Sequence, residues 1–536
     1  MTTEETTASP EVLIIGAGFA GMYMIHRLRE LGFAAKAVDA APEVGGTWYH
    51  NRYPGLRCDV ESLQYSYTFS EQLRNEWDWS ERYPPQSEIL AYAKWVADRL
   101  DLRRDVMLET RVVSAQWNEM EGRWLIGVED GRTFTPRFVI LATGALSVPR
   151  FPAIPGFDSF AGTLVHTASW PDEGVALAGK RVGLIGTGSS GVQVATAVAS
   201  EVAHLSIFQR TPAYTIPAHN RALTNEDRQY FRDNFAELDA WMRRTSGGIM
   251  AGPSKVSGVE LSAEERERLL REAWTKGGSF AFTGTFNDTR KNEQSNRYMA
   301  DFVRDRIRET VKDARTAELL CPQDFIAARR VCVDTGYYEI FNRDNVSLID
   351  VSGDPIAYVT ERGIRLTSGK EIDLDILVLA TGYDAITGAV LALDLVGRDG
   401  LTIRQVWADG PKCYLGLGIA GFPNMFTVTG PGSPSVLSNV LRSIEHHVGW
   451  ISDCLVAMRD RGARRIEVDA GAQEEWVRHV NEVADETLFT KTRSWYMGSD
   501  IPGKPRVFMP YAGGLPRYMA TCEKIATEGY TGFAIR

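Results

Sequence analysis

The sequence predicts an α/β fold with two similar strand–turn–helix units and a helical insertion in the second unit. Each unit contains a glycine-rich turn, Gly16–Gly21 in the first and Gly186–Gly191 in the second, and each turn follows an apolar run of strand type. A glycine-rich turn between a strand and a helix is typical of a site for a dinucleotide pyrophosphate. Residues 222–330 instead show charged residues at helical spacing and no strand pattern. We therefore expect two Rossmann-like dinucleotide-binding domains, the second of which carries the insertion.

The first unit spans residues 12–39, which is the length of a βαβ motif. Its glycines Gly16, Gly18 and Gly21 let backbone N–H groups approach a pyrophosphate at the start of the helix. Asp39 follows Gly16 by 23 residues, at the place where an acid hydrogen-bonds a free ribose diol. The first unit therefore predicts a dinucleotide that has no 2′-phosphate.

The second unit repeats this arrangement with a residue of opposite charge. Arg210 follows Gly186 by 24 residues, and an arginine at this place accommodates the 2′-phosphate of NADPH. The alternative interpretation is a tight structural turn with solvated charges at the strand ends. Opposite charges at matching distances argue against that alternative. The turn residues are Gly186, Thr187, Gly188, Ser189, Ser190 and Gly191.

Two apolar runs that end in small residues, 138–144 and 378–382, suggest that the chain crosses between the domains twice. The first domain is therefore expected to be discontinuous, because the second domain lies between its two segments in the sequence. We expect residues 1–145 and 383–536 to form the first domain, 146–221 and 331–382 the second domain, and 222–330 the insertion.

Shorter patterns predict the remaining elements. We expect helices over 20–31, 88–101, 262–270 and 301–316; strands over 106–117, 123–129, 132–135, 346–350 and 363–367; and a disordered polar leader over 1–10.

Composition excludes several classes of protein. The net charge of −10 provides no basic field for nucleic acid or an anionic membrane. The six cysteines form no Cys-x-x-Cys pair, so no structural metal is expected, and no apolar run reaches the roughly 20 residues of a membrane span. We expect a soluble, cytoplasmic protein with no nucleic acid or membrane partner. Its oligomeric state is not readable from the sequence.

Two further motifs narrow the class. Gly45-Gly46-Thr47-Trp48 is followed by the segment 53–59, which contains Tyr-Pro-Gly and ends in Asp59. Between the two glycine turns lies Phe160-x-Gly-x-x-x-His166-x-x-x-Trp170-Pro171. With these motifs the chain resembles the type I Baeyer–Villiger monooxygenases, and the resemblance extends over nearly its whole length. Among them it looks most similar to the phenylacetone and steroid monooxygenases, which share the Gly-Pro-Gly-Ser-Pro-Ser loop found here at 430–435.

The resemblance implies a reaction in which a ketone and O₂ give an ester or lactone. FAD and NADPH are the implied cofactors, and a flavin C4a-peroxide is the implied oxygenating species. Because that peroxide must stay anionic in a dry pocket, the site needs a fixed cation beside it. By resemblance the cation is Arg330, which Asp59 orients. Arginine suits this task because it stays charged and presents a rigid fork of donors.

The resemblance also assigns contacts to each cofactor. The implied FAD contacts are Gly16, Gly18, Gly21, Asp39, Gly46, Thr47, Trp48, Asp59, Tyr65 and Val440; the implied NADPH contacts are Arg57, Gly186, Thr187, Gly188, Ser189, Ser190, Gly191, Arg210, Thr211, Arg329 and Trp495. His166 is implied to brace the linker between the domains and is not a catalytic candidate.

Alternatives and departures remain. The chain could instead be a flavin monooxygenase that oxygenates nitrogen or sulfur, or a non-catalytic FAD- and NADPH-binding redox sensor. A dithiol flavin reductase is excluded because no Cys-x₄-Cys follows the first unit. His50 and Leu56 depart from residues common in the family, with an effect whose direction the sequence does not indicate. The loop 433–440 resembles that of family members that accept aryl, bulky cyclic or steroid ketones, and this resemblance implies a larger substrate.

Overall fold

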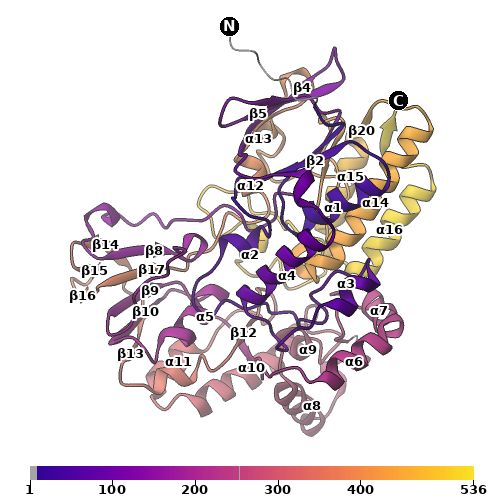
Figure 1. Ribbon diagram of the computed structural model, residues 1–536. Helices are drawn as coiled ribbons and strands as arrows, with labels where there is room; N and C mark the ends of the chain where they lie inside the picture. The colour runs from indigo at the N-terminus through magenta and orange to yellow at the C-terminus, as the bar shows by residue number, and fades with distance from the viewer. Residues whose placement is uncertain (1–8, 253) are drawn as a thin grey trace.

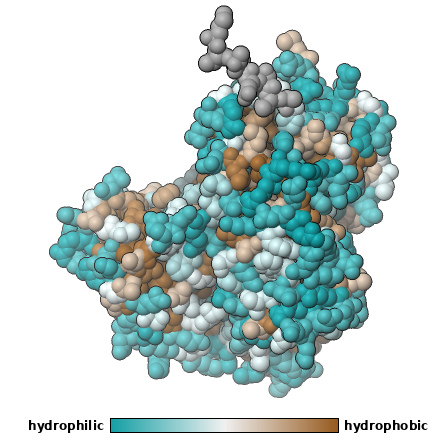
Figure 2. Space-filling view, viewed as in Figure 1, coloured by the Kyte–Doolittle hydropathy of each residue, from teal (hydrophilic) through white to brown (hydrophobic). Residues whose placement is uncertain are grey.

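The structure is a computed structural model that describes residues 9–252 and 254–536. Figure 1 shows two sheet-containing parts with a group of helices beneath them. The leader expected over 1–10 lies outside the described residues apart from its last two positions. No helix in the described ranges is long and apolar enough to cross a membrane. On the face seen in Figure 2 hydrophilic residues predominate, and hydrophobic residues are scattered between them.

The first sheet is parallel throughout. Val12 of its central strand pairs with Ala35 on one side and Phe138 on the other. All four residues of this strand are buried, since layers cover both faces of the sheet. Its strands, in order across the sheet, are β19 (Met425–Thr427), β7 (Phe138–Leu141), β1 (Val12–Ile15), β2 (Ala35–Val38) and β3 (Val106–Met107).

A helix layer and a small sheet cover the first sheet. Helix α1 (Phe19–Glu30) packs against α14 (Val440–Asp460), so the C-terminal segment shares the core of the N-terminal one (Figure 1). The opposite face is covered by β18 (Asp394–Val396), β4 (Val112–Asn118), β5 (Arg123–Val128) and β6 (Thr133–Phe134). The single strand expected over 106–117 is therefore wrong. It is two strands in different sheets, because the chain turns at Glu109, whose φ is +51°.

The second sheet repeats the same plan. Helix α5 (Ser189–Val198) follows the second glycine turn on one face. An antiparallel sheet of β14 (Ile356–Thr360), β15 (Gly363–Leu366) and β16 (Glu371–Asp373) covers the other face (Figure 1). The parallel strands, in order, are β13 (Val346–Asp350), β10 (His204–Gln209), β9 (Arg181–Ile185), β17 (Ile376–Leu379) and β8 (Thr163–His166).

Between β11 (Thr215–Pro217) and β12 (Cys332–Asp334) the described residues form helices and no strand. The stretch 301–316 is helical as expected except for a break, because α10 ends at Thr310 and α11 begins at Ala314. The break is stabilised by Asp313, whose side chain accepts a hydrogen bond from Thr316 N and caps α11. The helices are α6 (Asn225–Asp233), α7 (Phe235–Arg244), α8 (Ala263–Lys276), α9 (Ser279–Thr283), α10 (Glu293–Thr310) and α11 (Ala314–Leu320).

The other elements complete the first part of the molecule. They are α2 (Thr47–His50), α3 (Glu71–Glu76), α4 (Gln86–Arg99), α12 (Gly388–Leu391), α13 (Ile403–Val406), α15 (Ala470–Asp485), α16 (Leu515–Thr527), β20 (Ile466–Val468) and β21 (Phe533–Ile535). The domain boundaries proposed from the sequence stay a prediction.

Candidate active site

A cavity of about 1970 Å³ lies where the two glycine turns face each other. It exceeds the roughly 300–1,000 Å³ of an ordinary small-ligand site, so it has room for two large ligands. The predicted residues that line it are Gly16, Gly18, Asp39, Gly46, Thr47, Trp48, Arg57, Asp59, Tyr65, Gly186, Thr187, Gly188, Ser189, Ser190, Arg210, Thr211, Arg329, Arg330, Val440 and Trp495. Gly21 and Gly191 do not line the cavity. Each lies behind its turn, where a Cβ would meet the turn's own backbone at 1.8 and 2.1 Å.

Both turns approach the neighbouring strand so closely that only glycine fits. Gly16 has φ +110°, and a Cβ there would lie 2.4 Å from Ala142 O at the end of β7. Gly186 has the same φ, and a Cβ there would lie 2.3 Å from Ala380 O at the end of β17. The small residues that end these two strands therefore pack against the turns, which explains why the two apolar runs resemble each other.

The N-termini of the two helices that follow the glycine turns are suited to binding pyrophosphate groups. Helices α1 and α5 begin after Gly18 and Gly188, and no described side chain caps either start. Their first N–H groups are therefore free to bind an anion, aided by the helix dipole. A Cβ on Gly188 would meet nothing within 4 Å, so this turn borders open space. The glycine cradles fit the dinucleotides that the sequence predicts.

The two charged residues downstream of the turns, Asp39 and Arg210, both line the cavity. The Asp39 carboxylate accepts hydrogen bonds from Ala17 N at 2.6 Å and Ala41 N at 2.9 Å, so the first turn holds it in place. Arg210 is exposed to the cavity, and Thr187 Oγ1 donates to Thr211 O at 2.8 Å. The first turn thus presents an acid to the cavity, and the second presents a cation.

A second cation stands near Arg210. Arg329 forms an ion pair with Asp324 at 2.7 Å and donates to Arg493 O at 2.7 Å. Burial lowers the pKa of Arg329, and the positive charges of Arg210 and Arg493 lower it further. These three arginines form a positive region of the cavity wall, which suits the extra phosphate of NADPH. Arg57, in contrast, is held by Glu81 at 2.6 Å and by Tyr83 O.

Aromatic residues form the wall beyond the first turn. Trp48 Nε1 donates to Tyr65 OH at 3.1 Å, and their rings meet edge to face with centroids 5.8 Å apart. Burial raises the pKa of Tyr65, which keeps its hydroxyl neutral. Gly46 precedes α2, and Val440 begins α14. This wall is suited to a flat ring system.

Arg330 and Asp59 meet in a bidentate ion pair. Arg330 Nε donates to Asp59 Oδ2 at 2.6 Å, and Nη2 donates to Oδ1 at 2.7 Å. Nη1 donates to Val436 O at 2.8 Å. Three of the five guanidinium N–H groups are therefore used within the described chain, which leaves two for a ligand. Burial lowers the pKa of Arg330, but Asp59 more than offsets this and the pKa rises above the usual arginine range. The result is a permanent, oriented cation.

A C-terminal loop closes the cavity near Arg330. Trp495 belongs to the same apolar cluster as Val436, and its ring lies 4.3 Å from that of Tyr496. Arg150 binds Asp500 at 3.1 Å, and Lys504 pairs with a carboxylate of the strand-end loop after β17. Sequence reasoning missed these ion pairs because their partners lie more than 100 residues apart.

His166 is the last residue of β8, the edge strand of the second sheet. Its Nδ1 accepts from Ala168 N at 3.0 Å, while Nε2 lies 3.2 Å from both Arg150 O and Thr381 Oγ1. Burial lowers the pKa of His166, which favours the neutral ring. These contacts are structural. His50 and Leu56 line the large cavity, and burial lowers the pKa of His50.

Comparisons with known proteins show which family this chain resembles. Residues 10–242 match the family described as pyridine nucleotide-disulphide oxidoreductase. The chain is 42% identical over 534 residues to a Baeyer–Villiger monooxygenase of Pseudooceanicola batsensis, covering 99% of this chain and 97% of that protein. Its fold superimposes on an oxidized steroid monooxygenase bound to NADP with a TM-score of 0.94 and 46% identity, covering 98% of this chain and 99% of that one.

A relative with a different printed activity is nearly as similar. The chain is 40% identical over 527 residues to a phenazine N-monooxygenase of Lysobacter antibioticus, covering 98% of this chain and 97% of that protein. Proteins that are similar to this chain over its full length therefore include one named for oxygenation at nitrogen as well as those named for ketones.

Proposed function

This chain belongs to the Baeyer–Villiger monooxygenase family, and from that premise we propose that Arg330 and Asp59 provide the charge stabilisation on which its reaction depends. The protein is a FAD- and NADPH-dependent monooxygenase that converts ketones to esters or lactones with O₂. The observation that carries the proposed roles is the bidentate Arg330–Asp59 pair at the border of the cavity that both glycine turns face.

The cofactor sites follow from the residues already described. The first turn and Asp39 would hold FAD, with Trp48 and Tyr65 beside its ring system. The second turn with Arg210 would hold NADPH. When bound, the flavin supplies hydride acceptance from NADPH and transfer of one oxygen atom from O₂.

The chain's own residues supply orientation, charge and exclusion of water. Arg330 offers two free N–H groups to negative charge that develops on oxygen, and Asp59 prevents the guanidinium from turning away. The segment around Trp495 lines the same cavity as Arg330, and we propose that it limits the access of water to the ion pair. Val436, Ser438 and Val440 also line the cavity, and we propose that this loop admits aryl, bulky cyclic or steroid-like ketones.

The decisive experiment combines oxygen uptake with product identification. The FAD-loaded protein is given NADPH and acetophenone, cyclohexanone or progesterone, and products are identified by mass spectrometry. We expect an ester or lactone in proportion to the NADPH consumed. Recovery of all reducing equivalents as hydrogen peroxide with every ketone would contradict the proposal and favour a redox-sensing role.

Oxygenation at nitrogen is the second candidate, because one close relative is a phenazine N-monooxygenase. Phenazine and a thioether are therefore included in the panel. An N-oxide as the main product, with no ester from any ketone, would favour this candidate. We further propose a cytoplasmic location, supported by six cysteines that are all free thiols.

A further inference from the structure

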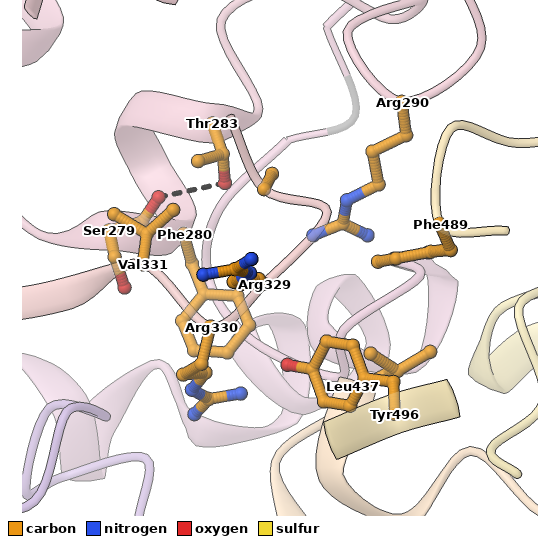
Figure 3. A pocket seen from close by; sticks show the side chains of 11 residues that line it. Ser279, Phe280, Thr283, Arg290, Arg329, Arg330, Val331, Leu437, Phe489 and Tyr496 are labelled. Carbon is orange, nitrogen blue, oxygen red and sulfur yellow. Dashed lines mark hydrogen bonds between the residues drawn. The ribbon is translucent and has the colours of Figure 1, made fainter. Parts of the chain in front are cut away.

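The Arg330–Asp59 pair joins two segments of the chain that are 271 positions apart. Asp59 ends the segment 53–59, which follows the first glycine turn. Arg330 precedes β12, and its guanidinium carbon lies 4.8 Å from the ring centroid of Phe280 in the insertion (Figure 3). The geometry of the pair therefore depends on how these two segments are held relative to each other, and residues that connect them nearby can position it.

The segment 53–59 is held on one side by the first part of the molecule. Leu56 O accepts a backbone N–H and Cys58 N donates to a backbone carbonyl, at 3.0 and 3.3 Å, and both partners lie in the stretch 84–86. The carbonyl of Arg57 lies between these two bonds and points to a different partner. The segment ends two residues later in the carboxylate of the ion pair. The partner of the Arg57 carbonyl is therefore close to that carboxylate along the chain.

Gln193 of helix α5 is this partner. Its Nε2 donates to Arg57 O at 3.0 Å, and its Oε1 accepts from Tyr53 OH at 2.9 Å, so one side chain holds the segment at two points. The backbones also approach closely, because Gly55 has φ +79° and a Cβ there would lie 2.5 Å from Gln193 O. Burial raises the pKa of Tyr53, so its hydroxyl remains a donor. The helix and the segment are therefore fixed to each other.

The same helix also touches the segment that carries Arg330. Ser189 is the first residue of α5, and its Oγ lies 3.5 Å from Sγ of Cys332, two residues after Arg330. Helix α5 thus contacts the chain on both sides of the ion pair, through Ser189 at its start and through Gln193 about one turn later. The start of α5 is also where the second glycine turn would bind the pyrophosphate of NADPH.

We propose that Gln193 is a positioning residue for the Arg330–Asp59 pair and couples coenzyme binding at the start of α5 to the position of Asp59. Its two hydrogen bonds hold the Asp59 segment against the helix, so that a coenzyme bound to the helix orders the segment as well. Gln193 also lines the large cavity, but the segment already uses its Oε1 and one Nε2 N–H. This inference rests on the proposed function, because Gln193 acts through the cation assigned there.

The first test measures how the reducing equivalents divide between products. Gln193→Met keeps the length of the side chain and removes both hydrogen bonds. The matched control is Thr196→Val on the same helix, because the Thr196 hydroxyl donates to Val192 O within α5 at 2.7 Å. With FAD-loaded protein, NADPH and the ketone of the panel that gives most ester, we expect Gln193→Met to form about threefold to tenfold less ester per NADPH, as expected for a lost hydrogen bond. Hydrogen peroxide should account for the balance.

Two quantities should stay close to wild type in Gln193→Met. The rate of flavin reduction at saturating NADPH and the Kd of NADP⁺ should each change less than about twofold, because the coenzyme contacts assigned to the second turn and Arg210 are intact. An unchanged ester yield in Gln193→Met, or an equal fall in Thr196→Val, would overturn the inference. A Kd of NADP⁺ raised about tenfold with an unchanged ester yield would overturn it in favour of a plain coenzyme contact.

Tyr53→Phe provides an independent check, because it removes one of the two bonds from the side of the segment. We expect a smaller fall in ester per NADPH than in Gln193→Met. The double variant should fall little further than Gln193→Met alone, since changes within one hydrogen-bond network are not additive. Full additivity of the two changes would overturn the inference.

Hydrogen–deuterium exchange tests the coupling without turnover. We expect NADP⁺ to slow amide exchange over 56–60 and 186–192 in FAD-loaded wild type, but over 186–192 alone in Gln193→Met. Equal slowing over 56–60 in both proteins, or none in wild type, would overturn the inference. Lack of ester from every ketone would overturn the proposed function, while loss of the exchange response over 56–60 in Gln193→Met would still support the coupling.

Discussion

Replacing Arg330 by alanine tests the central assignment directly. The change removes three hydrogen bonds, two to Asp59 and one to Val436 O, and leaves the Asp59 carboxylate without its partner. It also removes the two N–H groups of Arg330 that make no hydrogen bond within the described residues. Loss of one such donor to developing negative charge typically lowers kcat by about 10²–10³, or about 2.7–4 kcal/mol. We expect a loss of at least this size in ester formation.

Flavin reduction should behave differently. The NADPH contacts that we assign lie at the second turn and Arg210, so we expect NADPH to reduce the FAD of Arg330→Ala at close to the wild-type rate. Stopped-flow absorbance measures this step, while product analysis and peroxide detection measure the later fate of the oxygen. The expected pattern is normal reduction, little ester and release of hydrogen peroxide.

Controls define the outcome that would refute this reasoning. The folded state should lose about 1.5–3 kcal/mol at most, because Asp59 is a quarter exposed and water screens its charge. Arg330→Lys keeps the charge but not the bidentate fork, so we expect partial recovery. Wild-type amounts of ester from Arg330→Ala, with coupled NADPH use, would exclude the assigned role.

Three further predictions address the cofactor sites and pH. We expect Arg210→Ala to weaken NADPH binding by about 1.5–3 kcal/mol and narrow the preference over NADH; an unchanged preference in binding assays would place the phosphate elsewhere. Gly16→Ala should abolish FAD retention, because its Cβ would lie 2.4 Å from Ala142 O; the flavin absorbance of the purified variant checks this. Gly188→Ala should fold and weaken NADPH binding, which a titration with NADPH checks. Burial lowers the pKa of His446 to about 4, so the folded state resists a proton that the unfolded chain accepts near pH 6.5. The contribution of His446 to the free energy of unfolding should therefore be constant above about pH 6.5 and fall by about 1.4 kcal/mol per pH unit towards pH 4. In thermal melts at pH 7.5 and 5.5, His446→Leu should lose less stability between the two pH values than wild type does. An equal loss in both proteins would contradict this prediction.

Much of the cofactor architecture was predictable from local sequence. A strand, a glycine turn and a helix are set by neighbouring residues. The charge of the residue after the next strand indicates whether the bound ribose carries a 2′-hydroxyl or a 2′-phosphate. Asp39 and Arg210 both line the large cavity, while their contacts with the two cofactors stay a prediction. Errors occurred where a local pattern continued across a break. Asp313 caps α11, so the helical pattern of 301–316 contains a break. The turn at Glu109 separates two strands that the sequence pattern presents as one.

What the sequence by itself determined is therefore the two turns, their charged partners and the family. Only the tertiary structure decided which residues meet. Asp59 and Arg330 are 271 positions apart, so no periodicity or spacing brings their side chains within 2.7 Å. Local patterns encode hydrogen bonds between near neighbours, whereas the balance of charge in an enclosed space is a property of the folded whole.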